Sequence, residues 1–361
     1  ARRQQGMMGA VSEKDYRGLV SSHMLKNNNV SPAAISDART LFGPDLANVR
    51  GKTVRIKPDP VVENYVAIPR DFVLANKHLT LAADVFFVDG ISFLLTLSRR
   101  VKFVTAEHCP VRTAVALSNH LTKVLRVYSR AGFTVRYVLM DNEFEKVKDH
   151  LPSIVCNTTA AKEHVAEAER QIRTVKERSR GIRATLPFSS IPKRVKIELI
   201  YFIVFWLNAF PTRSGISRRF SPREIILRFQ LDIKKHCRVM FGEYCEVHDE
   251  PDPTNTQQPR THEAIALGPT GNTQGTVKFF CLQTGRVLKR RSFTIYPMPD
   301  RVIKRVNAVG LGQGQGRVLA FTDRNKKPYN WHDEVPEDDS EFQGLLETPA
   351  PFPAIPAELP G

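Results

Sequence analysis

Two apolar stretches separated by a single Asp-Gly pair constrain the fold of this chain more than any other feature. Residues 79–88 and 91–97 are rich in Leu, Val, Ile and Phe, and each has the length of a buried strand. Asp89-Gly90 has the composition of a two-residue hairpin turn. The sequence therefore predicts an antiparallel hairpin, which residues 101–105 extend as a third strand.

A helix and a further strand follow this meander. Apolar residues recur at helical spacing over 112–130, and Gly132 is suited to the left-handed cap that ends such a helix. Residues 133–140 then alternate as a strand. Further helices are predicted over 163–183, 192–209 and 221–229. This order of elements predicts an α/β fold with a mixed sheet and flanking helices, which we place at 78–231.

The rest of the chain divides by composition. Residues 1–77 are polar and read as an irregular, basic flanking region with helix-like pieces around 31–41. Residues 235–300 hold short β-rich pieces between Pro and Gly turns, which predicts a small β-barrel. Residues 301–361 begin with a glycine-rich run, interpreted as a linker, and end in an acidic, proline-rich segment that we expect to be disordered.

Charge points to a polyanionic partner. Lys and Arg number 53 against 37 Asp and Glu, for a net charge of +16. Residues 328–361 hold eight acidic residues and no Lys or Arg, so residues 1–327 carry +24. Such a field favours nucleic acid over an anionic membrane, because bound phosphates release counterions. The alternative is simply a soluble basic protein.

Cysteine use and hydropathy indicate an intracellular chain. Five scattered cysteines do not make a disulfide framework in a chain of 361 residues. The longest apolar stretch, 197–210, contains a Glu and is shorter than a membrane span, so it reads as a core helix. The chain starts at Ala1 without an initiator Met, and we expect a fragment or a segment of a polyprotein.

Three carboxylates are the candidate catalytic residues. Asp84 stands inside an apolar strand, where a carboxylate is costly unless it is paired or binds a metal ion. Asp141 falls at the carboxyl end of its strand, where ligand sites gather in α/β sheets. The alternatives are a polar residue near a sheet edge for Asp84 and a turn-forming role for Asp141. Asp89 has a sufficient explanation in the hairpin turn.

The third carboxylate, Glu169, opens a helix with a basic face. Arg173, Lys176 and Arg180 follow it at i+4, i+7 and i+11, beside an apolar stripe. This helix would present a carboxylate to a metal ion and cations to DNA phosphates. The alternative is a solvated helix with ordinary i,i+4 ion pairs.

These segments resemble the integrase region of copia-type retrotransposon polyproteins. The likeness spans roughly residues 30–305 and is strongest around the aspartate-terminated strand and the glutamate helix. The segments that carry it are 81–99, 132–145, 158–180, 201–211 and 221–225.

The resemblance implies an RNase H-like catalytic domain followed by an SH3-like β-barrel. It gives Asp84, Asp141 and Glu169 the roles of catalytic ligands to two Mg²⁺ or Mn²⁺ ions, and it matches Arg173 and Lys176 to DNA-contacting positions. The implied activity is 3′-end processing of element DNA and strand transfer into target DNA, with a homo-multimer as the working form. It further implies a cytoplasmic particle and then the nucleus as the location.

Two departures from the family pattern keep an alternative open. Glu169 follows Asp141 at a shorter spacing than is usual for the family, and residues 1–77 contain no Cys for the family's zinc module. The alternative is a catalytically inactive or domesticated nucleic-acid-binding remnant of the same fold. A weaker reading is a nuclease that hydrolyses without joining. For His236, Cys237, Cys245 and His248 we favour a structural role over a zinc site, since their spacing fits no zinc template.

Overall fold

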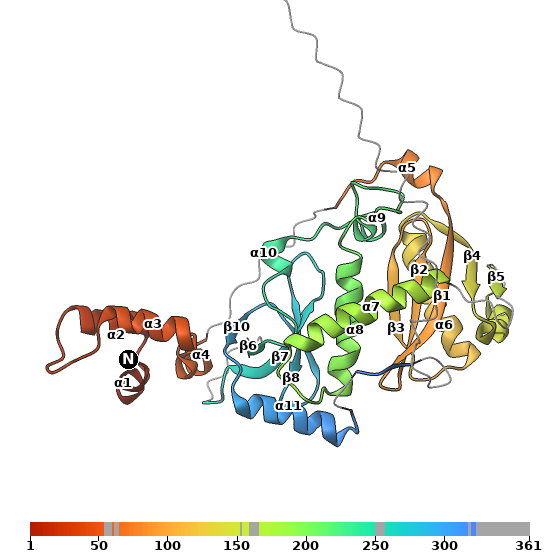
Figure 1. Cartoon of the computed structure of the whole chain (residues 1–361). Coiled ribbons are helices and arrows are strands. Elements are labelled where there is room, and N and C mark those ends of the chain that lie inside the picture. The colour runs from red at the N-terminus through yellow and green to blue at the C-terminus, as the bar shows by residue number, and fades with distance from the viewer. Residues whose placement is uncertain are drawn as a thin grey trace, which may run out of the picture.

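Two β-sheets with helices packed on them, and a separate group of N-terminal helices, make up the described part of this protein (Figure 1). The structure is a computed structural model that describes residues 1–53, 60, 65–151, 154–158, 166–249, 257–316 and 319–322. None of the described helices is long and apolar enough to cross a membrane. All five cysteines are free.

The first sheet is mixed. Its strands are β1 (His78–Val88), β2 (Ile91–Ser98), β3 (Val104–His108), β4 (Thr134–Met140), β5 (Val155–Thr158) and β11 (Phe321–Thr322). The order is β3-β2-β1-β4-β5, and β11 pairs with β1. Strands β1, β2 and β3 are antiparallel neighbours, whereas β4 runs parallel to both β1 and β5. The predicted meander and the mixed sheet are confirmed.

The predicted turn between the first two strands is also confirmed. Asp89 has φ of 49° and Gly90 has φ of 75°, the positive values that a primed hairpin turn requires. The Asp89 carboxylate forms a buried ion pair with Lys196 and accepts a hydrogen bond from the backbone N–H of Ala320. Asp89 is therefore structural, as the turn chemistry indicated.

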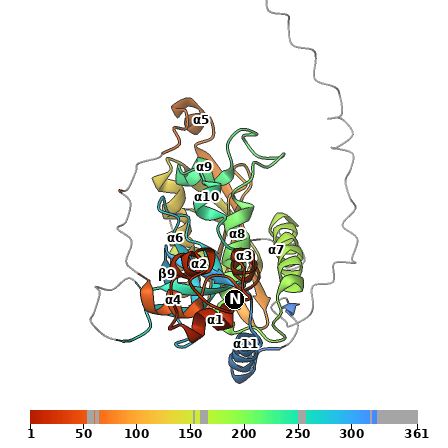
Figure 2. The same cartoon turned by 90° about the vertical axis from the view of Figure 1, so that its left-hand side faces the viewer.

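Helices cover both faces of this sheet. Alternate residues of β1, including Ala82 and Phe86, pack against α7 (Ala166–Thr185) and α8 (Lys193–Leu207). The intervening residues pack against α6 (Ala114–Arg130) and α9 (Pro222–Leu227). In Figure 2, α6 and α7 lie on opposite sides of the sheet. A 3₁₀ segment, η1 (Asn142–His150), follows β4 and was not predicted.

The second sheet is antiparallel and follows α10 (Ile233–His236). Its strands are β6 (Tyr244–His248), β7 (Thr261–Pro269), β8 (Val277–Cys281), β9 (Val287–Arg290) and β10 (Phe293–Tyr296). The order is β10-β6-β7-β8-β9, so the end strands β9 and β10 are not paired with each other. The predicted barrel is not closed among the described residues. Each end strand is short, and each pairs along one edge.

The described N-terminal residues are helical, which corrects the expectation of an irregular segment. The helices are α1 (Arg2–Met7), α2 (Glu13–Ser21), α3 (Pro32–Phe42), α4 (Leu46–Lys52) and α5 (Arg70–Ala75). Ser12, Ser31 and Asp45 cap the second, third and fourth of them through side-chain oxygens. Tyr16 and Ile35 form a small separate core with Val20.

The start of the predicted glycine-rich linker is instead a helix, α11 (Asp300–Gly312). Val302 and Val306 are buried in the main core, at the i,i+4 spacing of an amphipathic helix. A Cβ on Gly310 would lie 2.5 Å from the Ser190 hydroxyl oxygen, so this glycine permits close packing. The predicted acidic tail beyond Thr322 lies outside the described residues.

Candidate carboxylate site and basic helix

The two candidate aspartates lie at the same level of neighbouring parallel strands. Leu81 pairs with Val138 and Ala82 with Leu139, so the same register continued by two residues brings Asp84 level with Asp141. Alternation along β1 and β4 places both on the face that α7 covers. Asp84, in the middle of β1, and Asp141, directly after β4, therefore belong to the same face of the sheet.

Asp84 also stands where β1 loses its partner on one side. The pairing of β1 with β4 ends at Ala82, and β11 pairs only with Phe87 and Val88. Between these two contacts, the β4 side of β1 has no paired strand among the described residues. Asp84 is half-buried there, and its Oδ1 accepts a hydrogen bond from the backbone N–H of Val85 at 2.7 Å.

Asp141 begins a turn as well as ending a strand. Its carbonyl oxygen accepts a hydrogen bond from the backbone N–H of Phe144 at 3.0 Å, which opens η1. Its half-buried side chain stays at the strand end, level with Asp84.

Glu169 lies on the part of α7 that packs over the same face. Its neighbour Ala168 and the next-turn residue Ile172 are both fully buried in the core that contains Ala82. Glu167, two residues before it, forms an ion pair with Arg99 at 2.7 Å.

The structure brings these carboxylates to one face but not into one cluster. Within the described part of the chain, which includes all three residues, no group of three His, Cys, Asp or Glu side chains is arranged to hold a metal ion. Asp84, Asp141 and Glu169 therefore do not form a preassembled metal centre.

The basic face of α7 is a row of mutually repelling cations. Arg173 and Arg180 are exposed, and Lys176 between them is half-buried. Burial lowers the pKa of Lys176 below its ordinary value, and the positive charges of Arg180 and Arg173 lower it further. Arg173 also pairs with Glu177 at 3.2 Å, an exposed i,i+4 contact of the kind that contributes little. A bound polyanion would relieve the repulsion along this row.

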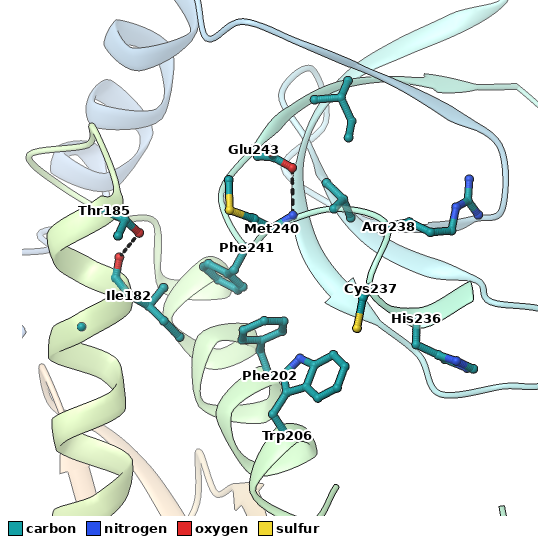
Figure 3. Close-up of a pocket in the computed structure, with 13 residues that line it drawn as sticks. Ile182, Thr185, Phe202, Trp206, His236, Cys237, Arg238, Met240, Phe241 and Glu243 are labelled. Atoms are coloured by element: carbon teal, nitrogen blue, oxygen red, sulfur yellow. Dashed lines mark hydrogen bonds between the residues drawn. The ribbon is translucent and has the colours of Figure 1, made fainter. Parts of the chain in front are cut away.

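An apolar pocket lies away from the carboxylates, where α7 and α8 meet the segment that leads into β6 (Figure 3). Its volume is about 600 Å³, and Phe202, Trp206 and Phe241 point into it. His236, on its rim, is hydrogen-bonded through both ring nitrogens, to Asp232 and to the carbonyl oxygen of Asn272. The structural role that we favoured over zinc fits this arrangement. No local pattern signals the pocket, because its walls come from separate segments.

Sequence reasoning missed a partly buried ion network that joins α4, the second sheet and α11. Arg50 contacts both Glu246 and Glu263 at 2.5 Å, and Arg301 contacts Glu263 at 2.5 Å. Tyr244 donates to Glu246 at 3.0 Å. The bond from Arg301 is the largest cause that lowers the pKa of Glu263, to about 2. The signal in the sequence was two glutamates inside apolar strands.

Comparisons with known proteins give a distant likeness to solved structures. No protein-family profile matches this chain, and no curated protein matches it. Among solved structures it is similar to the catalytic core domain of BIV integrase, with 16% identity and a TM-score of 0.30. The similarity covers 41% of this chain and 93% of that one. A likeness at this TM-score places no residue, so the site stands on the geometry of this chain.

Proposed function

We propose that this protein is an integrase-type polynucleotidyl transferase of a copia-type retrotransposon, acting on DNA. The observation that carries the proposal is the juxtaposition on one sheet face: Asp84 level with Asp141, under a helix that bears Glu169 and a row of cations. Three antiparallel strands continued by two parallel ones are consistent with an RNase H-like fold. We propose that the second sheet is an open form of the SH3-like module.

We further propose that Asp84, Asp141 and Glu169 are the catalytic carboxylates and that Mg²⁺ or Mn²⁺ is the cofactor. Two such ions activate an attacking hydroxyl and stabilise a leaving oxygen in phosphoryl transfer. The described carboxylates do not share a centre, so ion binding would have to draw them together. Arg173, Lys176 and Arg180 would hold DNA phosphates beside them.

A second candidate function is suggested by the finding that the three described carboxylates do not form a metal-binding group. A catalytically inactive nucleic-acid-binding protein of the same fold would keep the cationic helix and the charge of the body without a metal cluster. The short spacing between Asp141 and Glu169 favours the same conclusion. In this case DNA binding would not depend on metal ions.

The deciding experiment compares matched carboxylate variants. A labelled duplex with free 3′-hydroxyl ends and a supercoiled plasmid are incubated with Mn²⁺ and the wild-type chain, Asp84→Asn, Asp141→Asn or Glu169→Gln. Asp149→Asn is the control, because Asp149 is an exposed carboxylate nearby in η1. We expect cut and joined products from wild type and control, and none from the other three.

The products also separate the remaining candidates. Hydrolysed ends without joined plasmid would indicate a nuclease. DNA binding without any Mn²⁺-dependent product would establish the inactive binder. We propose a homo-multimer in the nucleus as the working form, since joining two DNA ends requires two sites, and light scattering of the DNA complex tests it.

A further inference from the structure

Basic residues also crowd a second surface, beyond the first turns of α7. Arg99, Arg100 and Lys102 lie in the turn between β2 and β3, and Arg213, Arg218 and Arg219 lie in the loop after α8. We call these six residues the basic corner. Neither segment, 99–102 or 212–220, contains an acidic residue.

The two segments are held together although they lie far apart in the sequence. Asn208, the buried cap of α8, accepts from the backbone N–H of Val104 at 2.8 Å and donates to the Val104 carbonyl at 2.7 Å. The backbone N–H of Ile216 donates to the carbonyl oxygen of Arg100 at 3.1 Å. The corner is therefore fixed by backbone contacts and not by the charges themselves.

The loop itself turns its cations outward. Ser217 accepts hydrogen bonds from the backbone N–H groups of Arg219 and Phe220, at 3.1 and 2.9 Å. Ile216 and Phe220 pack against the core on the α6 side of the sheet. Arg213, Arg218 and Arg219 are exposed. The apolar residues anchor the loop, and the arginines between them face solvent.

The corner adjoins the start of the cation row on α7. Burial is the largest cause that lowers the pKa of Lys102; Glu167 of α7 raises this pKa and Arg170 of α7 lowers it, so this end of α7 lies within electrostatic reach of Lys102. Arg170 precedes Arg173 by one helical turn. Arg99 contacts the same end of α7 through its ion pair with Glu167. The positive surface thus continues from α7 onto the corner.

We propose that the basic corner extends the DNA track of α7 and binds the phosphate backbone of duplex that runs past the helix. This inference rests on the proposed function for its partner, DNA, but not on catalysis. Helix α7 has 20 residues and so a length of roughly 30 Å, about nine base pairs of duplex. A duplex of about 20 base pairs reaches beyond the helix onto the corner, whereas one of about eight does not.

Binding without metal ions tests the corner separately from the chemistry. Fluorescence anisotropy in EDTA measures the affinity of the full chain for labelled duplexes of about eight and about 20 base pairs over a range of salt concentrations. The corner variant is Arg213→Gln/Arg218→Gln/Arg219→Gln. We expect about tenfold or greater weakening on the longer duplex, and a slope of log K against log salt shallower by about two to three. The corner variant should bind the short duplex with the same affinity as the wild-type chain.

Two further triple variants make the outcome specific. Arg3→Gln/Lys14→Gln/Lys26→Gln removes the same charge from exposed sites in the N-terminal region and should leave binding near wild type. Arg173→Gln/Lys176→Gln/Arg180→Gln should weaken both duplexes. If the corner variant binds DNA as tightly as the N-terminal control does, the proposal for the basic corner is overturned. Weaker DNA binding by the α7 variant in the same experiment would still support the proposed DNA path along α7. The corner variant could bind DNA less tightly while the wild-type chain makes no Mn²⁺-dependent product in the joining assay. That pair of results supports the basic corner and excludes only the proposed enzymatic activity. Circular dichroism and thermal melting confirm that each variant is folded.

Discussion

The same substitution should destabilise the protein much more at one aspartate of the first hairpin, Asp89, than at the other, Asp84. The Asp89 side chain is 9% exposed and its partner Lys196 is 1% exposed, so Asp89→Asn leaves a buried ammonium group without its carboxylate. Breaking a buried ion pair in this way costs about 3–5 kcal/mol. The amide oxygen of the substituted side chain still accepts from the backbone N–H of Ala320, so the loss measures the ion pair.

Asp84→Asn should cost about 1 kcal/mol or less, because Asp84 is half-buried and an asparagine oxygen still accepts from Val85. Urea unfolding at neutral pH gives both free energies, and an unchanged m-value shows that the unfolded states are alike. Asp89→Asn/Lys196→Met should recover most of the loss. We assign a structural role to Asp89 and a functional role to Asp84. Equal losses of unfolding free energy in the two variants, or a loss under about 1 kcal/mol in Asp89→Asn, would refute this assignment.

Three further outcomes are expected. Glu169→Gln should abolish Mn²⁺-dependent joining, whereas Glu167→Gln should keep it, because the carboxylate of Glu167 is held in an ion pair; equal loss in a joining assay would contradict this. Truncation after Lys327 removes eight acidic residues and should tighten DNA binding at low salt, which anisotropy measures; unchanged affinity would leave the tail a linker. The pKa of Glu263 is lowered to about 2, so its stabilisation is complete above the unfolded pKa near 4.5 and lost as pH falls toward 2. The free energy of unfolding of Glu263→Gln should depend less steeply on pH in that window. A pH dependence equal to that of the wild type would show that the ion network does not stabilise the fold.

The first sheet was predictable because its signals are local. Strand alternation and the Asp-Gly turn fix the first hairpin, and the end of β4 at Met140 fixes where Asp141 falls. The common level of Asp84 and Asp141 follows from two strand positions and one parallel register. Both aspartates could therefore be chosen from the sequence, although nothing in their spacing showed whether they form a metal centre.

Contacts between distant segments were not predictable from local patterns. The glycine run was interpreted as a linker because its close approach to Ser190 exists only in the packed chain. Strand β11 has two residues, too few for any periodicity, yet Phe321 stacks on Phe86 with ring centroids 6.2 Å apart. Arg50 and Glu246 come from opposite ends of the described chain, and no spacing rule reaches that far.

The frame around the three carboxylates limits how they can gather on a metal ion. Asp84 is paired through its backbone with Leu95 in the middle of β1. Asp141 lies between the fully buried Met140 and Phe144. Glu169 is fixed by its buried neighbours on α7, and moving that helix by a turn would expose them at about 1.5–3 kcal/mol for each large side chain. Backbone movement is therefore costly at all three positions.

Side-chain rotation is the remaining route, and it distinguishes the two proposed functions. Rotamer changes at Asp84, Asp141 and Glu169 cost on the order of 1 kcal/mol each, which an ion shared by three carboxylates offsets. Added Mn²⁺ should then broaden the carboxyl NMR signals of these residues while backbone hydrogen exchange in α7 and β1 stays the same. Changed exchange in α7 would contradict the rigid frame. Unbroadened carboxyl signals at the Mn²⁺ concentration of the joining assay would show that these three groups do not share a metal ion, and would favour the catalytically inactive DNA-binding protein.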